Sequence, residues 1–217
     1  MDVLNKLSFS RDVLKYTKSG EEHIDRLKNL DLFVLDNTIR ETTVGSLRGH
    51  TLENKKLIYE EVKKCKFQHY VIESFNHENR VGELLLQDLI DRGEDLSKAF
   101  AFSEVWESIV DKVPQYEPIP IGMQKCKQFG VKHVVLEIDL MYYKVDFEMF
   151  TMTDVCNMIG NRIEWIRENL AKDSKIFVNF RDFGDAMDHH PERIWKLTNY
   201  LSSFPPEDRI LGIAYED

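Results

Sequence analysis

The chain has 217 residues, of which 42% are hydrophobic and 31% are charged, and its formal net charge is −9. Such a length and composition are typical of a globular protein with one domain of good size or two small ones. The 38 acidic residues outnumber the 29 basic ones, which argues against nucleic-acid binding as the main role, because phosphate contacts need clustered Lys and Arg.

The three cysteines are far apart, at Cys65, Cys126 and Cys156, and no CxxC spacing occurs. Neither a zinc site nor a disulfide framework is therefore predicted, and a reducing compartment fits this pattern best. The N-terminus lacks the apolar stretch of a signal peptide, and nowhere do 18 apolar residues run together. We therefore expect a cytoplasmic protein without a membrane span.

Residues 1–30 form a charged, mildly amphipathic segment, predicted to be a helical N-terminal extension, and residues 31–217 form the main domain. Apolar runs in this domain predict six strands: Leu32–Asn37, His69–Phe75, Ala99–Val105, His133–Leu140, Lys175–Phe180 and Ile210–Tyr215. Helical patterns lie between them: Glu53–Lys66, Arg80–Asp91, Ile119–Phe129, Thr153–Ala171 and Pro191–Phe204. Thr51 is a candidate N-cap, and Gly93 and Gly130 stand where helices should end.

Strands that alternate with helices predict βαβ units and a parallel sheet in an α/β fold. Two architectures accommodate six strands: a (β/α) TIM-barrel-like fold with six of its eight units, or an open doubly wound parallel sheet. The chain ends on a strand with no covering helix after it, so we expect a barrel truncated at its C-terminus. The open strand edges of such a barrel predict a homo-oligomer.

Functional residues of parallel α/β sheets collect at the carboxyl ends of the strands. Every predicted strand here ends in polar or charged residues: Asp36, Thr38, Arg40, Glu41, Glu73, Glu104, Glu137, Asp139, Asn179, Arg181 and Glu216. Charged strand ends are commonly just solvated, and this ordinary interpretation is preferred for Glu104, Glu137 and Asp139.

The period of two along a strand places Thr38 and Arg40 on one face, and Asn179 and Arg181 on one face of another strand. Glu73 lies in mid-run, where an unpaired carboxylate is costly, so it needs a partner, and Arg40 is the obvious one. A ring of carboxylates with two arginines suits an anionic substrate and a divalent metal.

The stretch "DNTIRE", residues 36–41, resembles the first strand of the DRE-TIM metallolyase superfamily. That group includes 3-hydroxy-3-methylglutaryl-CoA lyase, isopropylmalate synthase and the carboxyltransferase domain of pyruvate carboxylase. "TLENK", residues 51–55, is similar to the start of its first helix, "VIESF" to its second strand, and "ILGIAYED" to its sixth. The likeness spans residues 32–217.

The resemblance implies a carbon–carbon lyase or an acyl or carboxyl transferase that acts on an anionic carbonyl substrate or an acyl-CoA through an enolate. It implies Mg²⁺ or Mn²⁺ as cofactor. Arg40 matches the arginine that stabilises the enolate, Glu73 the glutamate that orients it, and Glu41 the metal ligand. Thr38, Asn179 and Arg181 are the substrate-binding candidates.

Three departures from the family pattern leave a second function open. Glu41 replaces an aspartate, Val44 replaces a glutamine, and the family's His-x-His metal pair belongs to a seventh strand that this sequence does not include. The alternative is a metallolyase-like barrel that lost its metal site and serves as a non-catalytic binding or interaction module.

Overall fold

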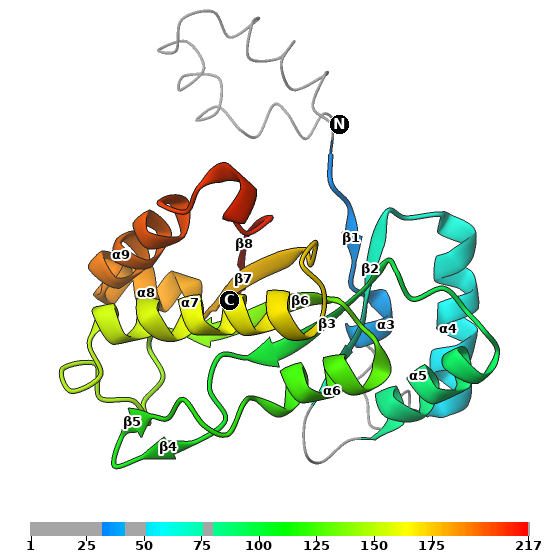
Figure 1. Cartoon of the computed structure of the whole chain (residues 1–217), viewed down its shortest axis with the longest axis horizontal. Helices are drawn as coiled ribbons and strands as arrows, with labels where there is room; N and C mark the ends of the chain where they lie inside the picture. The colour runs from blue at the N-terminus through cyan, green and yellow to red at the C-terminus, as the bar shows by residue number, and fades with distance from the viewer. Residues whose placement is uncertain (1–31, 42–50, 76–79, 217) are drawn as a thin grey trace, which may run out of the picture. The chain divides into compact units, whose positions relative to one another are not determined.

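The computed structural model describes residues 32–41, 51–75 and 80–216 (Figure 1). The chain divides into two compact units, Met1–Val34 and Leu35–Asp217, and the fold described below is that of the second. The predicted helical extension 1–30 and the departure at Val44 lie outside the described residues. No helix in the described part of the chain has the length and apolar character needed to cross a membrane.

Six strands form one parallel sheet in the order β1-β2-β3-β6-β7-β8. They are β1 Leu35–Asp36, β2 His69–Ser74, β3 Ala99–Glu104, β6 His133–Asp139, β7 Ile176–Arg181 and β8 Gly212–Tyr215. The order of the strands in the sheet is their order along the chain, so each crossover steps in the same direction (Figure 1). The sheet curls into a half-barrel, which fits both a partial barrel and an open parallel sheet. The described strands do not contain the reversal of order that defines a doubly wound sheet.

Five long helices connect the strands, at the predicted places. They are α4 Leu52–Cys65, α5 Val81–Asp91, α6 Ile121–Phe129, α7 Met152–Asn169 and α9 Pro191–Ser202. The predicted caps are confirmed: the Thr51 hydroxyl accepts a hydrogen bond from the backbone N–H of Asn54 at 3.2 Å, and Gly130 ends α6 with a φ of 71°. Smaller elements complete the unit: the helices α3 Thr38–Glu41 and α8 Phe183–His189, the hairpin of β4 Ile109–Val110 and β5 Val113–Pro114, and the 3-10 turn η2 Pro206–Asp208.

The first predicted strand is shorter than expected. Only Leu35–Asp36 is strand, and Thr38–Glu41 is helical. The Asp36 carboxylate accepts hydrogen bonds from the Thr38 backbone N–H at 3.1 Å and from the Thr38 hydroxyl at 2.9 Å. Such local side-chain bonds compete with a strand ladder and favour a helix start. Thr38 and Arg40 therefore do not share a strand face as predicted.

The sheet buries side chains on both faces. The larger core lies between the sheet and the helices and includes Ile72, Ala101, Leu136 and Val178. The alternate residues form a smaller cluster on the concave face, made of Val71, Phe100, Phe102 and Val135, with Leu35 and Phe177 packed against it. We call this cluster the apolar floor; it lies midway along the strands, between their amino ends and their carboxyl ends.

Candidate functional site

Polar side chains gather where four neighbouring strands end. Glu104 is paired in register with Glu137, Glu137 with Asn179, and Asp139 with Arg181. Glu104, Glu137 and Asn179 lie two residues after the concave-face residues Phe102, Val135 and Phe177, so they continue that face toward the carboxyl ends. We call the following group the carboxyl-edge cluster: Glu104, Glu137, Asp139, Asn179, Arg181 and Glu216.

Hydrogen bonds link the members of the carboxyl-edge cluster. The guanidinium of Arg181 donates to the Glu104 carboxylate at 2.8 Å. The Asn179 amide donates to Glu216 at 2.7 Å and to Glu137 at 3.4 Å. One amide therefore orients two carboxylates, and one arginine neutralises a third.

Glu137 is the most perturbed carboxyl group of this cluster. It is only 5% exposed, and burial raises its pKa to about 7, with the nearby Glu104 charge adding to the effect. The positive charges of Arg181 and Arg40 oppose this rise. Partial desolvation also raises the pKa of Glu104, whose side chain is half exposed, and of Asp139. The interpretation of Glu137 as a solvated strand end is wrong, because its side chain is buried and paired.

Arg40 reaches the concave face from the short helix α3. Its guanidinium lies 4.7 Å from the centre of the Phe102 ring and forms an ion pair with Glu41 at 2.6 Å. Phe102 lies two residues before Glu104 on the same strand, so this contact brings Arg40 beside the carboxyl-edge cluster, and its charge opposes the rise in the pKa of Glu137. The structure thus brings three predicted site residues, Arg40, Asn179 and Arg181, to one edge of the sheet, whereas the Thr38 hydroxyl is turned to Asp36.

Glu73 lies on the other side of the sheet. Its carboxylate forms an ion pair with the fully buried Lys55 ammonium of α4, and a side chain at Gly82 of α5 would collide with it. The predicted Arg40–Glu73 ion pair is wrong. The cause is a register shift between Val71 and Glu73, after which Glu73 pairs with Ala101, a residue of the helix-facing core.

The position implied for a metal ligand, Glu41, does not fit a divalent cation. Its Oε1 atom accepts from Arg40 at 2.6 Å and from the Asn37 amide at 2.5 Å, and its side chain is half exposed. Mg²⁺ needs several oxygen ligands around it. Among the described residues no group of three His, Cys, Asp or Glu side chains could hold a metal ion.

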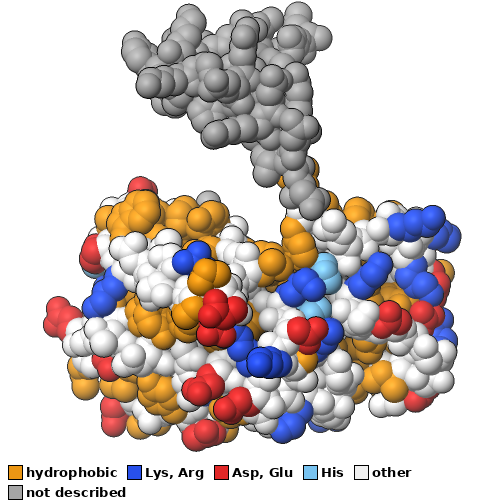
Figure 2. Space-filling model, turned by 45° about the horizontal axis from the view of Figure 1, so that its top comes forward, with side chains coloured by type: hydrophobic (Ala, Val, Ile, Leu, Met, Phe, Trp, Pro, Cys, Tyr) orange, Lys and Arg blue, Asp and Glu red, His pale blue; other side chains and the backbone are white. Residues whose placement is uncertain are grey.

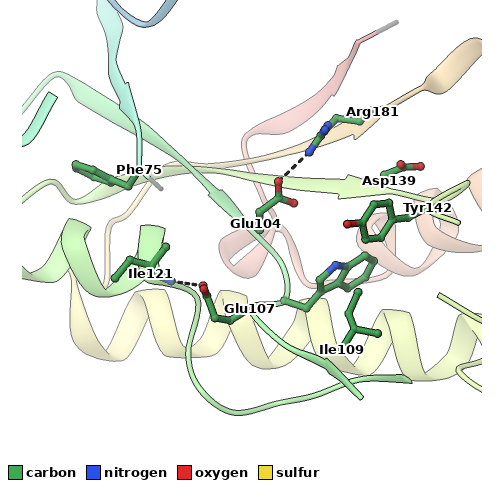
Figure 3. Close-up of a pocket in the computed structure, with 9 residues that line it drawn as sticks. Phe75, Glu104, Glu107, Ile109, Ile121, Asp139, Tyr142 and Arg181 are labelled. Atoms are coloured by element: carbon green, nitrogen blue, oxygen red, sulfur yellow. Dashed lines mark hydrogen bonds and ion pairs between the residues drawn. The ribbon is translucent and has the colours of Figure 1, made fainter. Parts of the chain in front are cut away.

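A pocket of ≈ 350 Å³ opens beside the carboxyl-edge cluster. Glu104, Asp139 and Arg181 form its polar wall, and the close-up in Figure 3 shows the Glu104–Arg181 pair at this wall. Trp106, Tyr142 and Ile109 are among its apolar lining. This volume lies at the lower end of the range for small-molecule pockets.

Glu107 connects the lining of the pocket to the start of helix α6. Its carboxylate accepts a hydrogen bond at 2.7 Å from the backbone N–H of Ile121, the first residue of α6, and Figure 3 shows both side chains at the pocket. A carboxylate at a helix N-terminus is stabilised by the helix dipole. Glu107 therefore holds α6 at the pocket and is already paired.

The sequence pattern predicts Glu104, Glu137 and Asp139 only as solvated strand ends. It does not predict Trp106, Glu107 or Tyr142 as site residues. The available signal was the shared position of the three acids at the ends of adjacent strands. No family model matches the chain, and no curated protein matches its sequence. The resemblance of residues 36–41 to the metallolyase signature stays a prediction.

Proposed function

We propose that the protein is an enzyme that generates an enolate from a small carbonyl-containing carboxylate, within a carbon–carbon lyase or acyl- or carboxyl-transfer reaction. The observation that carries this proposal is the Glu104–Glu137 pair, two adjacent carboxyl groups with raised pKa at the carboxyl edge of the sheet, next to Arg181. The half-barrel is, in this proposal, part of a (β/α)₈ barrel whose active sites lie at that end.

Two neighbouring carboxyl groups that interact strongly share a proton rather than ionise together. Arg181 favours the ionised form of Glu104, while burial favours the protonated form of Glu137. Glu104 lines the pocket, so it takes the proton from the carbon next to the substrate carbonyl. The C–H electron pair forms the C=C bond of the enolate, the π pair of the C=O bond moves to the oxygen, and the guanidinium of Arg181 stabilises the charge that develops there.

Pocket size favours a small free acid over an acyl-CoA thioester. The pocket has a volume of ≈ 350 Å³, at the lower end of the range for small-molecule sites, and Arg181 is the cation in its wall. Because the residues around Glu41 do not fit a divalent cation, no step of the proposal passes through a metal. A cytoplasmic location and homo-oligomer formation stay predictions from the sequence.

Solvent deuterium exchange tests enolate formation without knowledge of a second substrate. The protein is incubated with pyruvate in D₂O, and loss of the methyl proton signal is followed by NMR. We expect exchange above the buffer rate, reduced about 100-fold or more in Glu104→Gln. Glu148→Gln, which removes an exposed carboxylate, is the matched control and should keep the full rate. Exchange at the buffer rate with the unaltered protein would contradict the proposal.

A second candidate is a binding module that retains the fold without catalysis. It is favoured by the engagement of Glu41 with Arg40 and Asn37, which removes the family's metal ligand from use. Calorimetric binding of pyruvate that is lost in Arg181→Gln, combined with exchange at the buffer rate, would support this candidate over the enzyme.

A further inference from the structure

A second pocket lies at the opposite end of the strands. Its volume is ≈ 260 Å³, and it lies where α4 ends and where β2 and β3 begin. Its lining includes three aromatic residues, Tyr59, Phe67 and Tyr70, and three lysines, Lys63, Lys66 and Lys98. We call it the lysine pocket. No proposal made above for the carboxyl-edge cluster involves it.

The floor of the lysine pocket is aromatic. The rings of Tyr59 and Tyr70 meet edge to face, with centroids 5.9 Å apart and an interplanar angle of 79°. Both tyrosines are buried, the Tyr59 hydroxyl donates to the Glu94 carboxylate at 3.5 Å, and Phe67 is half-buried. Such a surface suits the flat face or edge of an aromatic ring.

The acidic residues at the rim are already occupied. Lys63 contacts both carboxylate oxygens of Glu94 at 2.9 Å. Asp95 accepts from the backbone N–H and the hydroxyl of Ser97, at 2.8 and 2.9 Å. Glu94 is thus neutralised by Lys63, whereas Asp95 is held by neutral donors and keeps its negative charge.

Lys66 and Lys98 keep their charge available. Among the described residues neither has a carboxylate within ion-pair distance. The backbone fixes the position from which each lysine side chain extends. Lys66 is the C-cap of α4, in the left-handed conformation with a φ of 56°. The backbone carbonyl of Lys98 accepts a hydrogen bond from the Tyr70 N–H at 3.3 Å. Two cations therefore stand at the rim of a hollow with an aromatic floor.

Two further lysines lie at the same end of the sheet as the lysine pocket. Lys132 and Lys175 directly precede β6 and β7, at the same end of the sheet as Lys98. On the face drawn in Figure 2, Lys and Arg side chains lie beside the histidines and over the right-hand part of the molecule, where Asp and Glu side chains are interspersed with them. Lys132 forms an ion pair with Asp173 at 3.2 Å.

We propose that the lysine pocket binds a small phosphorylated aromatic molecule. Its phosphate lies between Lys66 and Lys98, and its ring lies against Tyr59, Phe67 and Tyr70. A phosphate monoester carries a charge between −1.5 and −2 at neutral pH, roughly that of the two lysines with opposite sign, and lysine is a common phosphate partner. A carboxylate would match only one of them.

Calorimetry with phenyl phosphate tests this proposal on the full chain. Binding should weaken about tenfold for each lysine removed, in Lys66→Asn and in Lys98→Gln. Asparagine is chosen at position 66 because it tolerates the left-handed backbone. The matched control is Lys64→Gln, on the same helix but outside the pocket, where the lysine is exposed and pairs with Glu61.

Each outcome of this titration decides one part of the proposal. Inorganic phosphate should bind more weakly than phenyl phosphate, because it lacks the ring, and equal affinities would overturn the role of the aromatic floor. Benzoate that binds as well as phenyl phosphate would overturn the choice of phosphate. Absence of millimolar binding to the unaltered protein, or an equal loss in Lys64→Gln, would overturn the site itself.

Discussion

The two ends of the parallel sheet differ in the ionisable side chains that follow or precede the strands. The carboxyl ends hold Glu104, Glu137, Asp139 and Glu216. The amino ends hold Lys98, Lys132 and Lys175, together with His69 and His133. The apolar floor of Phe102, Val135 and Phe177 lies between the two sets along the concave face.

Burial acts on both ends, but in opposite directions. It raises the pKa of Glu137 to about 7 and lowers the pKa of His133 to about 4, so each group tends toward its neutral form. At the carboxyl end this produces a proton donor or acceptor poised near neutral pH beside a pocket. At the amino end it leaves neutral histidines and charged lysines, which suits anion binding rather than proton transfer.

The largest expected effect tests whether Glu73, at the end of β2, belongs to the carboxyl-edge cluster or to the helix layer. Glu73→Ala leaves the buried Lys55 ammonium without its partner, and we expect a loss of about 3–5 kcal/mol in the free energy of unfolding, measured by urea denaturation. Adding Lys55→Ala should cost less than the sum of the two single changes. Glu61→Ala, which removes an exposed carboxylate on α4, should change stability by no more than about 0.5 kcal/mol. A Glu73→Ala effect as small as this control would place Glu73 outside a buried pair.

The pH dependence of stability at the carboxyl end has a defined sign. Glu137 titrates near 7 in the folded protein and near 4.5 when unfolded, so the folded state binds more protons between these values. Stability from this group is therefore lost as the pH rises, by about 2–3 kcal/mol between pH 5 and pH 8. Glu137→Gln should remove this part of the dependence in urea denaturation. An unchanged profile in the variant would show that Glu137 titrates normally.

The amino end should show the reverse sign. His133 has a pKa of about 4 when folded, against 6.5 unfolded, so its contribution to stability is present above pH 6.5 and lost as the pH falls toward 4. We expect a loss of about 2 kcal/mol between pH 7 and pH 5 from this residue. His133→Asn retains an acceptor for the Lys175 backbone N–H, which His133 Nδ1 accepts at 3.0 Å, and should abolish that loss. An equal loss of stability in the unaltered protein and in His133→Asn would show that His133 does not cause this pH dependence.

The smallest expected effect concerns Arg181. Its ion pair with Glu104 is half exposed on both sides, so Arg181→Gln should change the free energy of unfolding by less than about 1 kcal/mol. Its effect on deuterium exchange into pyruvate should be large, because the guanidinium stabilises the enolate in the proposed reaction. A stability loss well above this value would make Arg181 a structural residue instead.

Much of the fold could be read from the sequence, because its helices and strands obey local rules. Apolar runs located the six strands, and Thr51 and Gly130 marked helix ends that the structure confirms. The bonds of Asp36 to Thr38, which turn a strand into helix α3, depend on side-chain geometry that an apolar pattern does not report. The register shift at Val71–Glu73 has no glycine or proline to signal it.

The site was harder to predict than the fold. Asn179 and Arg181 were predicted from their position at a strand end, and Arg40 from a strand pattern that is helix α3 in the structure. The pairing of Glu104 with Glu137 follows from the register of β3 against β6. Register is set by packing and crossover geometry across the sheet, which a single sequence does not specify. Glu73 was assigned to the wrong face for the same reason.

The account rests on a buried carboxyl group that titrates near neutral pH at the carboxyl edge, and NMR titration of the glutamate side-chain carboxyl carbons measures this directly. The signal of Glu137 is assigned by its disappearance in Glu137→Gln. We predict that this carboxyl titrates with a pKa of about 7. Titration of Glu137 near 4.5, like an exposed glutamate, would contradict the proposed proton-sharing pair and the chemistry built on it.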